Sequence, residues 1–154
     1  MSSRSTRRTF LKSTALAAIG MPTYIPASAL GKNGKVAPSN RIVLGGIGVG
    51  RRGQKVLDSF FQQKDVQFVA VADPQKERRE IIKRKTDEHY GNKDCVVYDD
   101  MSGILERNDI DAVLVTTGDR WHATASIYAA RAGKDIYCEK PCAMNIQECQ
   151  EPVS

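Results

Sequence analysis

The sequence predicts an α/β protein with a doubly wound parallel sheet of the Rossmann type. From Arg41 onward, short β-prone runs alternate strictly with helical segments, which implies right-handed crossovers between parallel strands. The first run leads into residues 48–53, a G-x-G-x-x-G motif at a strand-to-helix turn. Asp73 follows about twenty residues later at a strand end. We expect the strand order 3-2-1-4-5, with the glycine loop and Asp73 on one edge.

The first half of the chain supplies two strands and two helices. The first strand begins at Arg41, and residues 51–63 form a helix with one apolar stripe, made of Val56, Leu57, Phe60 and Phe61. Residues 66–72 are nearly all apolar, as in a strand covered on both faces. Pro74 is expected to begin the next helix, which continues to Tyr90 until Gly91 ends it.

The second half repeats the alternation. We expect a strand over 95–98, a short helix over 101–107, a strand over 111–116, a helix over 120–132, a strand over 135–138 and a helix over 145–151. Asp119 has the position of an N-cap, and Gly133 that of a helix stop. Pro152 would end the last helix.

The first 29 residues have the features of a twin-arginine export signal. Arg7 and Arg8 precede a mildly apolar stretch, and residues 27–29 form an A-x-A cleavage pattern. A membrane anchor is the alternative, but Pro22 and Pro26 interrupt a stretch shorter than the roughly 20 residues that a bilayer requires. We therefore expect export by the twin-arginine machinery to the periplasm, with no stable membrane anchor.

The expected domain organisation is a signal peptide over 1–29, a linker over 30–40, an NAD(P)-binding Rossmann domain over 41–151 and a tail over 152–154. The formal net charge of +5 falls to +1 without the signal, so a nucleic-acid surface is not indicated. The densest charged stretch, residues 76–88, alternates both signs, as a solvated helix face does.

The four cysteines form no C-x-x-C pair, and no histidine stands at a zinc-ligand spacing, so we predict no metal site. Cys95 and Cys138 lie in or beside predicted strands, where a thiol behaves as a small apolar residue.

The glycine motif predicts a dinucleotide site. Gly48 permits the tight turn, Gly50 lets the backbone approach a pyrophosphate at the helix N-terminus, and Gly53 lets the helix lie close to the strand. Asp73 can accept hydrogen bonds from the adenosine ribose and repel a 2′-phosphate, which favours NAD over NADP. Its alternative role is that of a helix N-cap directly before Pro74.

Two arginines and a lysine bear on the choice of cofactor and on the chemistry. Arg51 and Arg52 keep NADP as an alternative cofactor, because either guanidinium could reach a phosphate. Lys140, after the fifth strand, could transfer a proton if its pKa were lowered by burial and a neighbouring nicotinamide, whereas its alternative is an ordinary surface lysine.

The motifs resemble, in order and spacing, the N-terminal domain of the glucose-fructose oxidoreductase/inositol dehydrogenase (Gfo/Idh/MocA) family. The resemblance rests on the glycine loop, on Ala72-Asp73-Pro74, on the segment 116–122 and above all on Cys138-Glu139-Lys140-Pro141. It implies that Lys140 is the catalytic lysine and that Glu139 adjoins the nicotinamide ribose. The predicted cofactor-binding residues are Gly48, Val49, Gly50, Arg51, Arg52, Gly53, Asp73, Thr116, Thr117, His122, Glu139 and Lys140.

The resemblance also implies an α/β substrate domain, with a catalytic histidine, beyond the matched part. The only histidines are His89 and His122, so we expect a truncated member. The leading hypothesis is the NAD(P)-binding portion of an exported oxidoreductase that acts on a sugar, polyol or related hydroxyl compound by hydride transfer. The alternatives are a noncatalytic nucleotide-binding or interaction module and a nonfunctional gene fragment.

Overall fold

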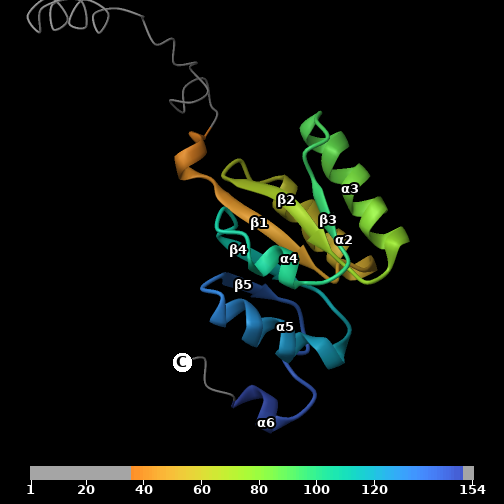
Figure 1. Cartoon of the computed structure of the whole chain (residues 1–154), viewed down its shortest axis with the longest axis vertical. Coiled ribbons are helices and arrows are strands. Elements are labelled where there is room, and N and C mark those ends of the chain that lie inside the picture. Colours follow the sequence, from red (N-terminus) through yellow and green to blue (C-terminus); the bar gives the residue numbers. More distant parts are fainter. Residues whose placement is uncertain (1–35, 151–154) are drawn as a thin grey trace, which may run out of the picture.

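A computed structural model describes residues 36–150 as a five-stranded parallel sheet (Figure 1). The strands are β1 (Ile42–Ile47), β2 (Val66–Ala72), β3 (Val96–Tyr98), β4 (Ala112–Val115) and β5 (Asp135–Cys138). Their spatial order is β3-β2-β1-β4-β5, and every neighbouring pair is parallel. The predicted fold class and strand order are therefore confirmed. A register shift between Leu44 and Gly45 interrupts the pairing of β1 with β2.

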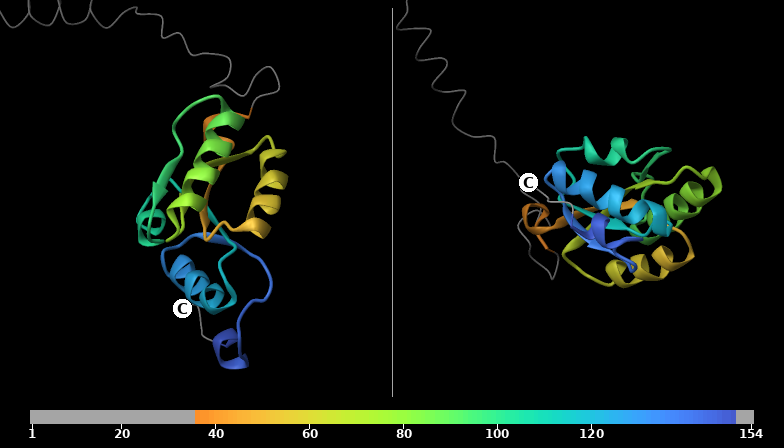
Figure 2. Two further views of the ribbon diagram at one scale, coloured as in Figure 1. Left: turned by 90° about the vertical axis from the view of Figure 1, so that its right-hand side faces the viewer. Right: turned by 90° about the horizontal axis from the view of Figure 1, so that it is seen from below.

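Four helices cover the two faces of the sheet: α2 (Arg51–Phe61), α3 (Lys76–Tyr90), α4 (Ser102–Leu105) and α5 (Asp119–Arg131). A short fifth helix, α6 (Ile146–Cys149), lies apart from the strands (Figure 1). Figure 2 shows α2 and α5 on opposite sides of the strands. This doubly wound arrangement explains the continuous apolar runs in the central strands, since both faces of those strands are packed.

Each face has its own apolar core. Val56 and Leu57 of α2 and Ile82 of α3 pack with Phe68 on one face. The other core contains these residues from the sheet, α4, α5 and the segment before β4: Ile47, Ala70, Ala72, Ile104, Ile110, Val113, Val115, Ala125 and Ala129. Small alanines on α5 let this helix lie close to the strands.

Only α2 starts at the predicted residue, and the starts of α3 and α5 change the capping residues that the sequence predicted. Helix α3 begins at Lys76 rather than Pro74, and Gln75 is its N-cap. Helix α5 begins at Asp119 itself, so Gly118, and not Asp119, is its N-cap. Asp119 instead occupies the first turn, where a carboxylate interacts favourably with the helix dipole.

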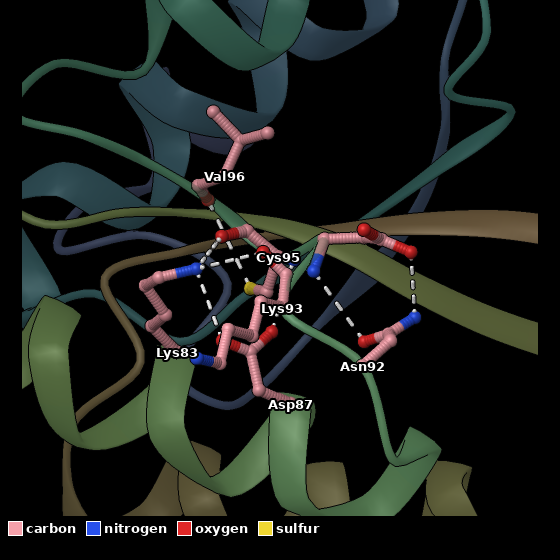
Figure 3. A network of polar contacts seen from close by, with 7 residues as sticks. Lys83, Asp87, Asn92, Lys93, Cys95 and Val96 are labelled. Carbon is pink, nitrogen blue, oxygen red and sulfur yellow. Dashed lines mark hydrogen bonds and ion pairs between the residues drawn. The ribbon is translucent and has the colours of Figure 1, made fainter.

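A polar network fastens α3 to the chain entering β3 (Figure 3). Lys83 donates to the carbonyl oxygen of Cys95 at 2.5 Å and pairs with Asp87 at 3.0 Å. Asp87 in turn accepts a hydrogen bond from the backbone N–H of Cys95 at 3.1 Å. Burial raises the pKa of the Cys95 thiol to about 11, because the apolar core around it disfavours the charged thiolate.

The predicted export signal lies outside the described residues, as do residues 30–35 of the predicted linker and the tail. Within residues 36–40, Pro38–Asn40 form a 3₁₀ turn, and Arg41 donates to the carbonyl oxygen of Val36 at 3.0 Å. Across residues 36–150, no helix has the length and apolar character needed to span a bilayer.

Candidate dinucleotide site

The predicted site residues follow strands whose carboxyl ends meet at one edge of the sheet. Residues 48–53 follow β1, Asp73 follows β2, Thr116 follows β4 and Glu139 follows β5. Four backbone hydrogen bonds extend the strand pairing into these loops: Gly48 N to Ala72 O (2.8 Å), Asp73 N to Tyr98 O (3.2 Å), Thr116 N to Ile47 O (3.0 Å) and Glu139 N to Val115 O (3.0 Å). Ligands of open α/β sheets bind at this edge.

The three motif glycines have different surroundings. Gly48 has φ +67°, and a Cβ there would lie 2.7 Å from the Cα of Thr117. A Cβ on Gly53 would overlap the Thr116 hydroxyl, so this glycine permits the close approach of α2 to the end of β4. A Cβ on Gly50 would meet only one atom within 4 Å, the Arg78 Nη1 at 3.8 Å. Gly50 thus leaves open space between the α2 N-terminus and a guanidinium, which suits an anionic diphosphate.

A pocket of about 360 Å³ opens beside the glycine loop. It is lined by Ile47, Gly48, Ala72, Asp73, Pro74, Gln75, Arg78, Asp99, Asp100, Met101, Thr117, Gly118, Trp121 and Ala125. Apolar walls with a few polar groups from several strand ends are typical of a small-molecule or cofactor site.

Asp73 is not the N-cap of α3, which is Gln75, but its carboxylate lies in the turn before that helix and beside the glycine loop. Its side chain is only 2% exposed, and Oδ1 accepts the backbone N–H of Gln75 at 2.8 Å. The carboxylate therefore orders the turn before α3. Its other oxygen, Oδ2, lies 3.9 Å from Arg78 Nη1, in the pocket wall. This second oxygen is placed to accept hydrogen bonds from a ribose.

Three other predicted residues, Val49, Thr116 and His122, are buried and support the glycine loop and the loop after β4. Val49 is fully buried and packs in the same apolar core as Val56 and Leu57 of α2, so it supports the glycine loop from the protein interior. The Thr116 hydroxyl donates to the carbonyl oxygen of Gly48 at 3.1 Å. His122 is 2% exposed, and its Nδ1 lies 2.9 Å from the Thr117 hydroxyl. These contacts hold the glycine loop and the loop after β4 in position.

Arg52 and Glu139 form an ion pair across the edge of the sheet. Arg52 Nε and Nη2 donate to the two Glu139 carboxylate oxygens, each at 3.1 Å. These hydrogen bonds lower the pKa of Glu139. Arg51 and Lys140 are exposed, and within residues 36–150 neither side chain makes a hydrogen bond or ion pair. Neither Arg52 nor Lys140 lines the 360 Å³ pocket.

Several pocket residues were not among the predicted site residues, and Arg78, Met101 and Trp121 are three of them. Arg78 lies on the stretch interpreted as a solvated helix face, and its side chain is 47% exposed, yet it borders Asp73 and Gly50. Met101 and Trp121 supply apolar wall. Arg78 and Trp121 each stand in the first turns of a helix that begins at the ligand-binding edge, and this is the sequence signal that could have found them.

The fold and the site define a dinucleotide-binding domain, and comparison with known proteins gives its family. The profile of the GFO_IDH_MocA oxidoreductase family, described as an NAD-binding Rossmann fold, matches residues 42–154. The chain belongs to this family and contains its NAD(P)-binding domain.

Relatives and solved structures agree with this assignment. A glycosyl hydrolase family 109 protein of Shewanella sp. strain MR-4 is 32% identical over 96% of this chain, which spans 36% of that relative's length. The myo-inositol dehydrogenase of Lactobacillus casei, solved with NAD(H) and myo-inositol, superimposes with a TM-score of 0.61 at 28% identity, covering 70% of this chain and 31% of the other. The 3-ketoreductase KijD10 of Actinomadura kijaniata, solved with NADP, has a TM-score of 0.59 at 26% identity, with coverages of 71% and 32%.

Proposed function

We propose that this chain is the cofactor-binding portion of an exported oxidoreductase that uses NAD to act on a sugar, polyol or related hydroxyl compound. The observation that carries the proposal is Asp73, whose buried carboxylate presents Oδ2 beside the glycine loop. A carboxylate at this position accepts hydrogen bonds from the ribose hydroxyls and repels a 2′-phosphate. Arg78 moderates the preference, because a nearby guanidinium attracts that phosphate.

Lys140 is the proposed proton-transfer group. It follows Glu139 directly at the end of β5, where its exposed amine can meet a substrate. A bound nicotinamide would supply the acceptor for the hydride that leaves the substrate carbon. Lys140 would accept the hydroxyl proton as the carbonyl forms, so the substrate loses a hydride to the cofactor and a proton to the lysine.

The relatives favour carbohydrate-like substrates but suggest two reactions. The inositol dehydrogenase was solved with a polyol, which supports oxidation of a ring hydroxyl. The second candidate is glycoside hydrolysis, because the Shewanella relative is a glycosyl hydrolase family 109 protein. Formation of NADH with myo-inositol would favour the first reaction, and release of the aglycone from an aryl glycoside the second.

Cofactor preference is tested by replacing Asp73. We expect Asp73→Ala to weaken NAD binding about tenfold, through loss of a charge-assisted hydrogen bond, and to weaken NADP less. Isothermal titration calorimetry measures both affinities. Asp73→Asn keeps an acceptor for the Gln75 N–H and isolates the loss of charge, whereas Asp58→Ala is the control on the exposed face of α2. An unchanged ratio of NAD to NADP affinity in both Asp73 variants would contradict the assignment.

Export is proposed from the arginine pair in the N-terminal sequence. We expect Arg7→Lys combined with Arg8→Lys to leave the precursor in the cytoplasm, because twin-arginine transport depends on that pair. Cell fractionation and immunoblotting of precursor and mature forms measure the effect. Normal processing of the double variant would show that the N-terminus is a general secretory signal instead.

A further inference from the structure

The Arg52–Glu139 ion pair joins two parts of the site that are far apart in sequence. Arg52 is in the first turn of α2, directly before Gly53, and Glu139 follows the last residue of β5. Both carboxylate oxygens accept from the guanidinium at 3.1 Å. A bidentate pair fixes the mutual orientation of its partners as well as their distance.

Glu139 is held firmly, although Arg52 is 68% exposed along its side chain. The Glu139 residue is only 8% exposed, and its N–H donates to the carbonyl oxygen of Val115 at 3.0 Å. Backbone and side chain therefore fasten Glu139 to two different neighbours, β4 and α2. The next residue is Lys140, so the same contacts determine where Lys140 leaves the sheet.

The pair also removes an electrostatic conflict. An unpaired carboxylate at this edge would repel the phosphates that the α2 N-terminus attracts. Arg52 compensates the charge of Glu139, and the lowered pKa of Glu139 reflects that compensation. Arg52 directs its Nε and Nη2 at Glu139, and its side chain does not line the pocket that contains Asp73.

We propose that Arg52 is a positioning residue: through the bidentate pair with Glu139 it holds the Glu139–Lys140 segment in place for the nicotinamide half of the dinucleotide. This inference rests on the proposed function. It assigns Arg52 a task different from phosphate binding, which the sequence had suggested.

The two halves of the site make the inference testable. Asp73 and the pocket beside it form the adenosine half, and that pocket includes neither Arg52, Glu139 nor Lys140. AMP occupies only this half, whereas NAD spans both. Loss of the pair should therefore affect NAD and spare AMP.

The experiment uses the full chain with Arg52→Met, with the charge exchange Arg52→Glu plus Glu139→Arg, and with Lys55→Met as control. Lys55 is an exposed cation of the same helix that lines the same groove as Arg52. In Arg52→Met we expect NAD binding to weaken about tenfold, AMP binding to stay within about twofold, and hydrogen exchange at the Glu139 amide to quicken about tenfold. The charge exchange should restore part of each loss, and Lys55→Met should change none of them.

Equal weakening of AMP and NAD in Arg52→Met, or unchanged exchange at Glu139, would overturn the positioning role. If the unaltered chain bound neither nucleotide, the proposed function would fail. The exchange rate at Glu139 would still decide separately whether Arg52 holds that segment.

Discussion

Gly50→Val should weaken NAD binding by about a hundredfold or more while leaving the thermal midpoint nearly unchanged. The backbone at Gly50 is extended, with φ −77° and ψ −164°, a conformation that valine adopts readily. A Cβ there would contact only Arg78 Nη1, at 3.8 Å, so the fold has room for the side chain. The valine methyls would instead fill the space between the α2 N-terminus and Arg78, where we place the diphosphate.

Calorimetric titration with NAD and a thermal melt of the same preparation test this prediction together. Wild-type affinity in a folded Gly50→Val protein would show that the dinucleotide does not approach this backbone. A large drop in thermal midpoint would instead show that the open space around Gly50 is occupied in solution.

Gly48→Val, unlike Gly50→Val, should destabilise the fold. We expect it to lower the free energy of unfolding by about 3 kcal/mol or more. Gly48 has φ +67°, which is strained for a β-branched residue. Its Cβ would also lie 2.5 Å from Thr117 Cγ2 and 2.7 Å from Thr117 Cα. A backbone atom cannot rotate away, so the loop after β4 would have to move.

Urea denaturation measures the loss, with Gly118→Ala as control. Gly118 has φ −73°, and its Cβ would meet no atom within 4 Å, so we expect a change within about 0.5 kcal/mol. Equal stability of Gly48→Val and the wild type would contradict the close packing of the glycine loop against Thr117.

Local patterns in the sequence were sufficient for the fold and for part of the site. The glycine spacing predicts the turn after β1, and Gly91 ends α3 in the left-handed conformation that only glycine adopts readily. Apolar runs predict the strands, because the central strands are covered on both faces. Helix starts were less predictable, since several residues near Pro74 and Asp119 have similar capping preferences.

Long-range contacts could not be predicted in this way. Arg52 and Glu139 are separated by 87 positions, and nothing local distinguishes Arg52 from Arg51. Arg78 stands among many charged residues of α3, and only the packing of that helix against β2 and β3 turns its side chain toward Asp73. The partners of exposed side chains depend on tertiary geometry, which sequence periodicity does not specify.

The most direct test of the account is an isotope-edited amide NMR titration of the full chain with NAD. We predict that the largest shift changes occur at Gly48, Gly50, Asp73, Thr117 and Glu139, since all five lie at one edge of the sheet. Changes confined to other surfaces, such as the groove between Glu80 and Lys93, would contradict a dinucleotide site at that edge. The absence of any change at millimolar NAD would contradict dinucleotide binding itself.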